Sequence, residues 1–336
     1  MLLSSIRPPE AFIPKRNARD SFSSDNPAAG QPSPSPGNPS AGRENNQGFE
    51  GLSLSLDGRT LYALLQSALR QDGGEDGNSQ RRHTRLLAYD IANPASPVLT
   101  GEWILPLPLY TQSGAQQVAS VGDMVAINGR QFLVLVRDGN GRGGDTPASL
   151  YRAVLVYDVS GATNLAGSAF DNPNNAAAPK GVLAASIVPA SSAVLINLND
   201  AAQLSRFGLN NGPSDNSNTL SEKWESLALV PALDPDFPDD FFLLVGNDND
   251  YTTTDGRQDG ANYKEDQNIY SMILVHRVTL PGSGRATPPV VVTAPAGVYA
   301  NPGSTASFSV VASAGGGAVA YQWLRGGTPI SGATNP

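Results

Sequence analysis

The sequence contains no cysteine, and His83 and His276 are its only two histidines. The absence of cysteine excludes disulfide bonds, thiolate catalysis and zinc sites built on thiolates. A serine-hydrolase triad is unsupported too, because there is no G-x-S-x-G motif and little histidine to serve as a base. His276 follows an apolar run, where a packed or hydrogen-bonded imidazole is the better interpretation.

Charge and long apolar runs are also scarce. Charged residues make up 15% of the chain, and no segment shows sustained helical periodicity. No run approaches the ~20 apolar residues of a membrane-spanning helix. The net charge of −8 argues against a nucleic-acid or anionic-membrane surface and favours cations, metal ions above all, as partners. The opening residues, MLLSSIRPPEAF, lack the apolar length and cleavage pattern of a secretory signal.

Glycine and proline, by contrast, are abundant, with 35 and 27 copies. Turn formers with low charge favour many short strands, so the sequence predicts an all-β protein. Asp57-Gly58 and Asn128-Gly129 are turn pairs that tolerate positive φ, and an Asp/Pro-rich loop, Asp234–Asp240, takes the same place further on. Three units therefore share one pattern of strand, turn, strand, polar loop and strand, and they occupy residues 50–97, 123–164 and 225–282.

Repeats of this kind predict the blades of a β-propeller. A β-sandwich is the alternative, but a sandwich would not require the same polar turns and loops between the strands of every unit. A propeller ring typically has about four to eight blades. We therefore expect residues 1–281 to form about three blades of a larger propeller, with N-terminal blades and a signal peptide missing. The Pro/Ser-rich stretch Ser23–Gly48 is expected to be a surface connection.

Each unit opens with an acidic residue, and these are Glu50, Asp123 and Glu225. Because the first strand of a blade lines the central channel, we expect these carboxylates near one face of it. The third unit adds Asp248 and Asp250 on a returning strand and loop. Facing carboxylates repel unless they are protonated, paired or bound to a cation, and calcium takes about six to eight oxygen ligands.

The pattern thus predicts a calcium site formed by Glu50, Asp123, Glu225, Asp248 and Asp250. The alternative is that each acid caps backbone N–H groups or pairs with an arginine. Arg137, in RDGNGRG, and Lys223 are the cations expected to bind an anionic substrate group, although Arg137 could instead pair with an acid. No catalytic residue is indicated.

The composition and the strand pattern of the sequence change near its C-terminal end. Residues 282–289 are expected to be a Gly/Pro/Ser linker. Residues 290–336 are expected to be an incomplete immunoglobulin-like domain. Within them TASFSVVAS and AYQWLRGG resemble strands B and C of a bacterial immunoglobulin-like domain, with Trp323 at the position of the core tryptophan. Such a domain needs about 100 residues, so we expect only its beginning here.

Several motifs resemble the phytase-like family, also described as esterase-like activity of phytase, over most of residues 6–281. They are GRENNQGFEGLSLSLDGRTLYALLQSAL, RDGNGRG, DVSGATNL and EKWESLALVPALDPDFPDDFFLLVGNDNDY. The resemblance implies a secreted propeller protein, and the hypothesis that follows is calcium-dependent hydrolysis of phosphate or other esters. A non-catalytic propeller for adhesion or ligand binding, with the immunoglobulin-like part as a spacer, is the alternative.

Overall fold

The computed structural model describes residues 4–22, 39–73, 80–212, 214–258, 260–280, 290–313 and 319–336. The predicted linker and residues 23–38 of the Pro/Ser-rich stretch lie outside these ranges. The chain divides into two compact units. The first comprises Met1–Ala228 and Leu244–Leu274, and the second comprises Leu229–Leu243 and Val275–Pro336.

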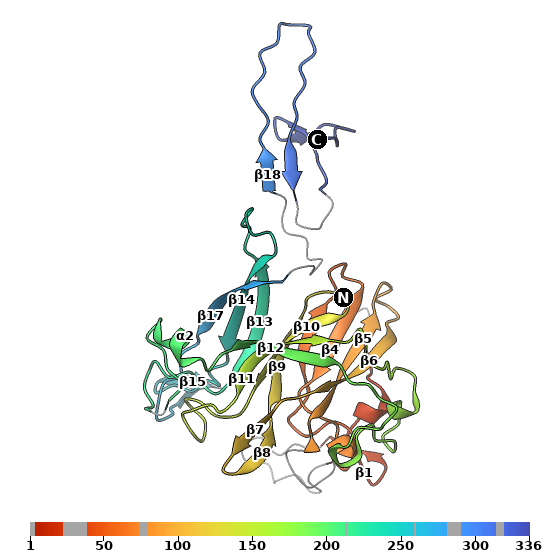
Figure 1. Cartoon of the computed structure of the whole chain (residues 1–336), viewed down its shortest axis with the longest axis vertical. Coiled ribbons are helices and arrows are strands. Elements are labelled where there is room, and N and C mark those ends of the chain that lie inside the picture. The colour runs from red at the N-terminus through yellow and green to blue at the C-terminus, as the bar shows by residue number, and fades with distance from the viewer. Residues whose placement is uncertain are drawn as a thin grey trace. The chain divides into compact units, whose positions relative to one another are not determined.

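The main sheets of the molecule are antiparallel meanders, which confirms the all-β prediction (Figure 1). In the first sheet the strands follow one another in space as in sequence: β3 (Phe49–Leu54), β4 (Thr60–Leu65), β5 (His83–Asp90) and β6 (Val98–Pro106). The second sheet has the same arrangement: β9 (Ser120–Ala126), β10 (Gln131–Arg137), β11 (Arg152–Asp158) and β12 (Ser191–Asn197). The third sheet is β13 (Trp224–Pro231), β14 (Asp240–Asn247) and β17 (Ile273–Thr279). Each sheet corresponds to one predicted unit.

The remaining elements are short. In the first unit they are η1 (Glu10–Phe12), β1 (Lys15–Arg16), β2 (Arg19–Asp20), α1 (Arg70–Gly73), β7 (Leu109–Gln112), β8 (Ala115–Val118), η3 (Ala169–Asp171), η4 (Pro179–Gly181), α2 (Ala201–Ser205), β15 (Gly256–Gln258) and β16 (Ala261–Tyr263). In the second unit they are β18 (Val290–Thr293), β19 (Val311–Ser313), β20 (Leu324–Arg325) and β21 (Thr328–Pro329). Among the described residues, no helix has both the length and the apolar character to cross a membrane.

The two predicted hairpin turns form, but by different means. Gly58 adopts φ +70°, as expected for the β3–β4 turn. Neither Asn128 nor Gly129 adopts the positive φ that this pair tolerates. The Asn128 side-chain oxygen instead accepts the N–H groups of Arg130 and Gln131, both at 2.9 Å. A side chain that accepts from the backbone two or three residues on closes the turn without left-handed backbone.

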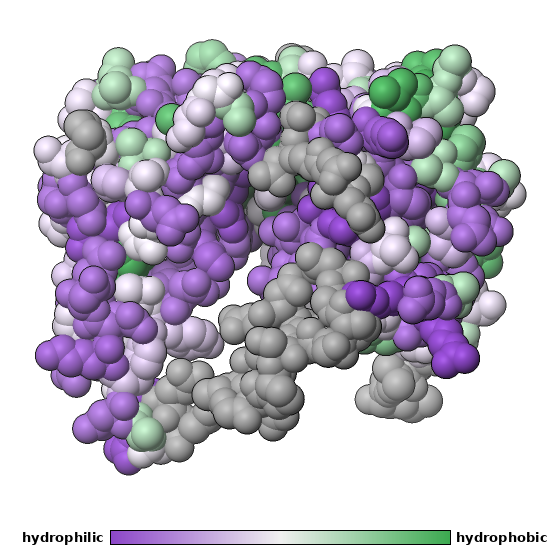
Figure 2. Space-filling model, turned by 90° about the horizontal axis from the view of Figure 1, so that it is seen from below, coloured by the Kyte–Doolittle hydropathy of each residue, from purple (hydrophilic) through white to green (hydrophobic). Residues whose placement is uncertain are grey.

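The hydrophobic core of the first unit lies between the first two sheets. Alternate residues along a strand point to one face, and on the facing sides of these sheets those residues are apolar. Tyr62 of β4 meets Phe132 of β10 edge to face, with ring centroids 4.8 Å apart. Around this pair pack the buried residues Leu64, Leu86, Leu105, Met124, Val134, Val136 and Leu155. Hydrophilic residues predominate over the face shown in Figure 2.

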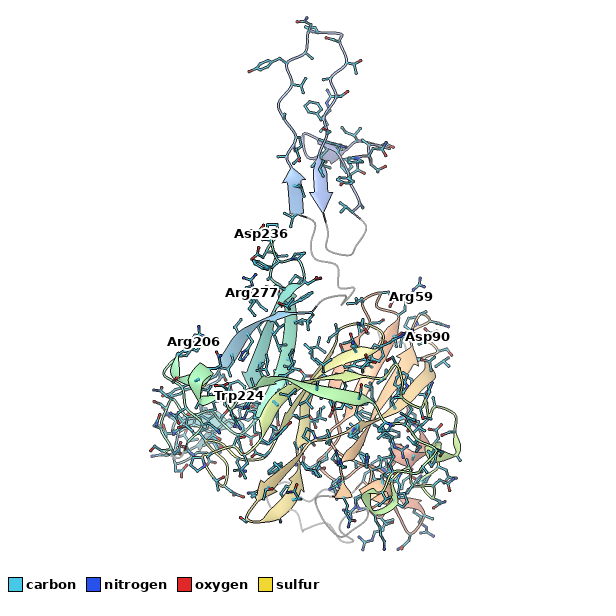
Figure 3. All side chains as sticks on the ribbon, viewed as in Figure 1. Arg59, Asp90, Arg206, Trp224, Asp236 and Arg277 are labelled. Atoms are coloured by element: carbon cyan, nitrogen blue, oxygen red, sulfur yellow. The ribbon has the colours of Figure 1, made fainter. Side chains whose placement is uncertain are left out.

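The two ends of the first sheet carry different residues, and only one end carries a residue of the predicted site. Arg59 and Asp90 lie at the end where β3 turns into β4, and the Arg59 carbonyl accepts the N–H of Ile91 at 2.8 Å (Figure 3). Glu50, near the start of β3, belongs to the opposite end of the sheet. The predicted site therefore lies where first strands begin and second strands end.

In the second unit, the Asp/Pro-rich loop is fastened by one arginine. Arg277 bonds Asp240 through Nε at 2.5 Å and Asp234 through NH2 at 2.7 Å. Its guanidinium also lies 5.2 Å from the centre of the Phe237 ring. Figure 3 labels Arg277 and Asp236 at this end of the third sheet.

The tail of the second unit consists of two-stranded pairings, β18 with β19 and β20 with β21. Trp323 lies near Phe308, with ring centroids 6.3 Å apart, although half of the Phe308 surface (51%) is exposed. Two sheets packed as a sandwich are not seen in the described residues, so the immunoglobulin-like domain stays a prediction.

Candidate functional site

The three acidic residues that open the predicted units come together in the first unit. Glu50 is exposed to solvent, yet desolvation by the surrounding protein raises its pKa, and the negative charges of Glu225 and Asp123 raise it further. Arg137 and Lys223 act in the opposite direction and lower it. Such mutual electrostatic effects require proximity, so the three acids and the two predicted anion-binding cations share one region. We call these five residues the charge cluster.

Two glycines allow the first strands of neighbouring sheets to approach closely. A Cβ at Gly51 in β3 would lie 2.7 Å from the Cβ of Met124 in β9. A Cβ at Gly122 in β9 would lie 2.4 Å from the carbonyl oxygen of Trp224 in β13. No side chain fits at either distance. Since Glu50 and Asp123 are their direct neighbours, these contacts place both carboxylates near the next sheet.

Asp123 has a structural role. Its Oδ2 accepts the N–H of Leu227 in β13, and its Oδ1 accepts the N–H of Met124, both at 2.7 Å. Burial raises the pKa of Asp123, and these two N–H donors lower it. The carboxylate thus caps backbone donors, as the alternative interpretation expected, and ties β13 to β9.

Arg137 and Glu225 form an ion pair within the charge cluster. Arg137 NH2 donates to Glu225 Oε1, and NH1 donates to the carbonyl oxygen of Asp138 at 3.0 Å. The Arg137 side chain is 9% exposed and that of Glu225 27%, so this pair is screened by solvent less than a surface pair. The predicted alternative for Arg137, pairing with an acid of the neighbouring unit, is therefore present.

Lys223 connects the acidic loop after β14 to the charge cluster. Its Nζ lies 3.2 Å from Asp250 Oδ2, with side chains that are 32% and 53% exposed. Asp248 Oδ1 accepts the N–H of Asp250 at 2.9 Å. The backbone N–H of Asp248 donates to the Lys223 carbonyl oxygen at 2.7 Å. Asp250 thus reaches the charge cluster through Lys223, whereas Asp248 accepts from its own loop.

The RDGNGRG motif is a folded loop held by Asp138. The buried Asp138 carboxylate accepts the N–H groups of Leu150 at 2.6 Å and of Tyr151 and Asn140 at 3.2 Å. Gly141 adopts φ +142°, and a Cβ there would lie 2.5 Å from the Ser221 carbonyl. The motif therefore packs directly against the segment that leads into Lys223.

Sequence reasoning missed Arg152, which faces Arg137 directly across β10 and β11. Arg152 is buried, and its NH2 donates to the carbonyls of Ser221 at 2.8 Å and Asn140 at 3.1 Å. Its guanidinium lies 5.8 Å from the centre of the Trp224 ring. Burial lowers the pKa of Arg152 to about 9. The sequence did hold a signal for Arg152, because a charged residue stands directly before the apolar run AVLVY.

Glu222 is the second residue that was missed. Burial raises the pKa of its carboxyl group, and the charges of Lys223 and Arg137 lower it. It borders the charge cluster. Its position directly before Lys223 in EKWES would have been enough to nominate it.

Glu50 is the member of the charge cluster best placed to bind a cation. Among the described residues, its carboxylate makes no hydrogen bond or ion pair, and the negative Glu225 is close by. A cation there would offset the repulsion between the two acids. Within the same part of the chain, no three aspartate, glutamate or histidine side chains are already arranged as a metal-binding group. The protein thus offers two carboxylates, and the other oxygens that calcium needs would come from water and ligand.

The fold and the charge cluster define an all-β protein of meander sheets that brings charged side chains of neighbouring sheets together. The model of the phytase-like family, described as esterase-like activity of phytase, matches residues 2–251, and the chain belongs to this family. The family predicted from the sequence motifs is thereby confirmed.

A relative from Arthroderma benhamiae, named "Uncharacterized secreted protein", is 38% identical over 272 residues. The alignment covers 76% of this chain and 52% of the relative, so the chain spans about half the relative's length. No solved structure matches the chain.

Proposed function

We propose that the chain is part of a secreted β-propeller protein that hydrolyses phosphate or other esters with calcium bound at the charge cluster. One observation carries the proposal: carboxylates and cations from three successive sheets converge on one region. Membership of the phytase-like family supports ester hydrolysis, and the name of the Arthroderma benhamiae relative supports secretion.

The propeller interpretation draws support from how the sheets meet. Each sheet is an antiparallel meander, and its first strand approaches the first strand of the next sheet. The contacts at Gly51 and Gly122 repeat this relationship between two successive pairs of sheets. Blades arranged around a common axis have this geometry, because their innermost strands line one channel.

Within this proposal the members of the charge cluster have different roles. Glu50 and Glu225 would bind calcium, which polarises an ester oxygen and lowers the pKa of a bound water. Lys223 is one third exposed, so its ammonium group can leave Asp250 and bind an anionic substrate group. Arg137 orients Glu225 and adds positive charge beside it. Asp123 holds the third sheet in place.

Hydrolysis assays on the full chain test this proposal. Release of phosphate from p-nitrophenyl phosphate and phytate, and of nitrophenol from p-nitrophenyl acetate, is measured with calcium and with a chelator. We expect turnover that the chelator abolishes and that Glu50→Gln and Lys223→Gln reduce. Arg142→Gln is the matched control, because Arg142 belongs to the same RDGNGRG motif as Arg137 but pairs with Asp215 at 2.6 Å. Turnover that resists the chelator, or that falls equally in the control, would contradict it.

A non-catalytic binding protein is the second candidate function, and one observation favours it. Asp123, Glu225 and Asp250 already have hydrogen-bond or ion-pair partners within the chain. In that case the charge cluster stabilises the sheets, and residues 290–336 act as an immunoglobulin-like spacer. Absence of turnover on every ester, together with retained fold and ligand binding, would select this alternative.

A further inference from the structure

The connection from β11 to β12 is a strap that packs on a sheet to which neither strand belongs. We define the strap as residues 159–190. Leu165, Ala177 and Ile187 of the strap bury Ile104, which is in β6 of the first sheet. The Leu165 N–H donates to the carbonyl oxygen of Glu102 at 2.7 Å. The strap thus joins the second sheet to the first.

Beneath the strap lies a buried charged group centred on Arg85. Arg85 bonds Asp72 Oδ2 through NH2 at 2.8 Å and through Nε at 3.2 Å. Its NH1 bonds Glu102 Oε1 at 2.6 Å and the Phe170 carbonyl at 3.1 Å. Asp72 Oδ1 accepts the N–H of Ala177 at 2.6 Å. All three charged side chains are 0% exposed.

Two carboxylate oxygens at this group, one on Glu102 and one on Asp171, accept no hydrogen bond from the described residues. The side chain of Asp171, in the strap, interacts with that of Glu102. Asp171 Oδ2 accepts the N–H of Gly167 at 2.8 Å, whereas Oδ1 has no donor among the described residues. Glu102 Oε2 is likewise buried without a donor in the described part of the chain. The buried Glu102 carboxylate and the Asp171 carboxylate repel when both are negative, and a proton on Glu102 Oε2 supplies the donor that Asp171 Oδ1 lacks.

Other charged groups near this pair come from several elements. Asp72 is in α1, Arg85 and Tyr89 are in β5, and the positive charge of Arg85 opposes three carboxylates. His83, also in β5, interacts electrostatically with Asp72. Burial raises the pKa of Tyr89 to about 12, and Glu102 and Asp171 contribute to that shift, so the phenol stays protonated.

We propose that a proton shared between Glu102 and Asp171 is a pH-sensitive latch that holds the strap on the first sheet and releases it in alkaline solution. Burial, reinforced by Asp171, raises the pKa of Glu102 from 4.5 to about 8 against the influence of Arg85. Because the pKa is higher in the fold than in the unfolded chain, this contribution to stability is complete below pH 4.5 and is lost as the pH rises through about 8.

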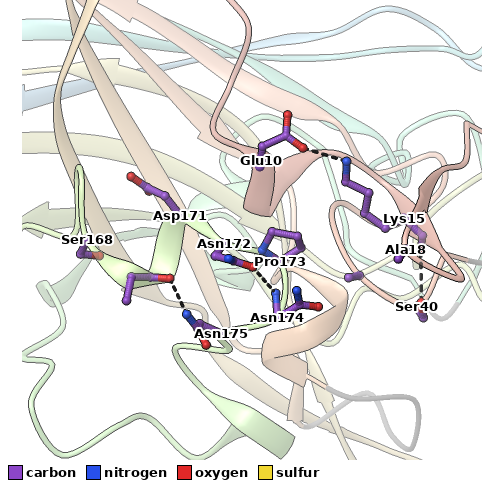
Figure 4. A pocket seen from close by; sticks show the side chains of 12 residues that line it. Glu10, Lys15, Ala18, Ser40, Ser168, Asp171, Asn172, Pro173, Asn174 and Asn175 are labelled. Atoms are coloured by element: carbon purple, nitrogen blue, oxygen red, sulfur yellow. Dashed lines mark hydrogen bonds and ion pairs between the residues drawn. The ribbon is translucent and has the colours of Figure 1, made fainter.

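The latch also controls the shape of a cavity. The cavity has a volume of about 770 Å³ and is lined on one side by Glu10, Lys15 and Ser40. The strap forms another side, through Ser168 and the run from Asp171 to Asn175 (Figure 4). Release of the strap removes that wall, so any ligand of this cavity is expected to dissociate in alkaline solution.

Limited trypsin digestion measures release of the strap directly. Lys180, in η4, is the only lysine or arginine between residues 153 and 205, so cleavage after it reports on the strap alone. Cleavage after Arg257, which is exposed in β15, provides an internal standard for the activity of trypsin at each pH. The full chain is digested from about pH 6.5 to about pH 9, and the ratio of the two cleavage rates is determined by mass spectrometry. Release of one proton predicts that the ratio rises by up to about tenfold per pH unit above the transition.

Two substitutions in the carboxyl pair, with a third outside it as a control, distinguish the latch from general loosening of the fold. Glu102→Gln keeps an oxygen for Arg85 and gains an N–H for Asp171, so the ratio is expected to be flat with pH. Asp171→Asn is expected to behave in the same way, and Tyr89→Phe is expected to keep the wild-type dependence. Infrared spectroscopy of the wild type at neutral pH is expected to show a protonated carboxyl band that Glu102→Gln removes. A flat wild-type ratio, an unchanged rise in Glu102→Gln, or absence of that band would overturn the proposal.

Discussion

Asp123 in the second sheet accepts the backbone N–H of Leu227 in the third sheet at 2.7 Å. This one bond joins the first strands of two sheets, at the place where Gly122 allows the two backbones to approach. A side chain that the sequence suggested as a metal ligand thus has a structural task.

Replacement of Asp123 is expected to destabilise the protein. Asp123→Ala leaves two backbone N–H groups without an acceptor, which costs about 1–3 kcal/mol of unfolding free energy. Asp123→Asn keeps one acceptor and is expected to cost less. Urea denaturation measures both, with Glu50→Gln as the control, because Glu50 accepts no comparable bond in the described structure. Equal stability of Asp123→Ala and wild type would contradict the structural role.

Removal of Arg85 is expected to cost much more. Arg85→Met leaves the Asp72 carboxylate buried without a counter-charge and Glu102 Oε1 without its donor, a change that typically costs about 3–5 kcal/mol. Arg142→Gln breaks a partly exposed pair with Asp215 and should cost less than about 1 kcal/mol. Similar denaturation midpoints for the two variants would show that the buried group is not stabilising.

His83 is expected to make the fold sensitive to acid. Burial, together with the charge of Arg82, lowers its pKa below 6.5, so the imidazole is neutral in the fold and binds protons more readily when unfolded. Its contribution is therefore present above pH 6.5 and is lost as the pH falls through the lowered pKa. His83→Gln should reduce the loss of thermal stability on acidification below neutral pH. A variant with the wild-type pH profile would refute this assignment.

The charge cluster predicts opposite effects of two substitutions on one carboxyl group. Glu225→Gln removes a negative neighbour and is expected to lower the pKa of Glu50, whereas Arg137→Gln removes a positive neighbour and is expected to raise it. Carbon NMR of protein labelled at glutamate side chains can follow the titration, with Glu50→Gln to assign the signal. Shifts of the same sign in both variants would mean that the three groups are not neighbours.

Much of the fold could be predicted from the sequence, because its signals are local. The Asp57-Gly58 turn and the alternation in LSLSL identify β3 and β4 without reference to any other part of the chain. Repetition of this pattern in three units predicted three sheets and placed Glu50, Asp123 and Glu225 at equivalent positions. These equivalent positions in repeated sheets are what allowed their convergence to be predicted from the sequence.

The partners of these residues could not be predicted, because they depend on how sheets meet. The bond from Asp123 to Leu227 requires the register between two sheets, which no local pattern encodes. The group of Asp72, Arg85, Glu102 and Asp171 draws its members from four elements, and Asp171 is in the connection between two strands of another sheet. The way in which the turn at Asn128-Gly129 closes was not predicted either. The Asn128 side chain accepts a backbone N–H there, and Gly129 does not adopt positive φ.

Calorimetric calcium titration of the full chain tests the central claim most directly. We predict binding that Glu50→Gln and Glu225→Gln weaken by about tenfold or more, since each removes a carboxylate ligand. Asp123→Asn should leave the affinity unchanged, because both oxygens of Asp123 accept backbone N–H groups. Unchanged affinity in both glutamine variants, or no binding by the wild type, would contradict a calcium site at the charge cluster.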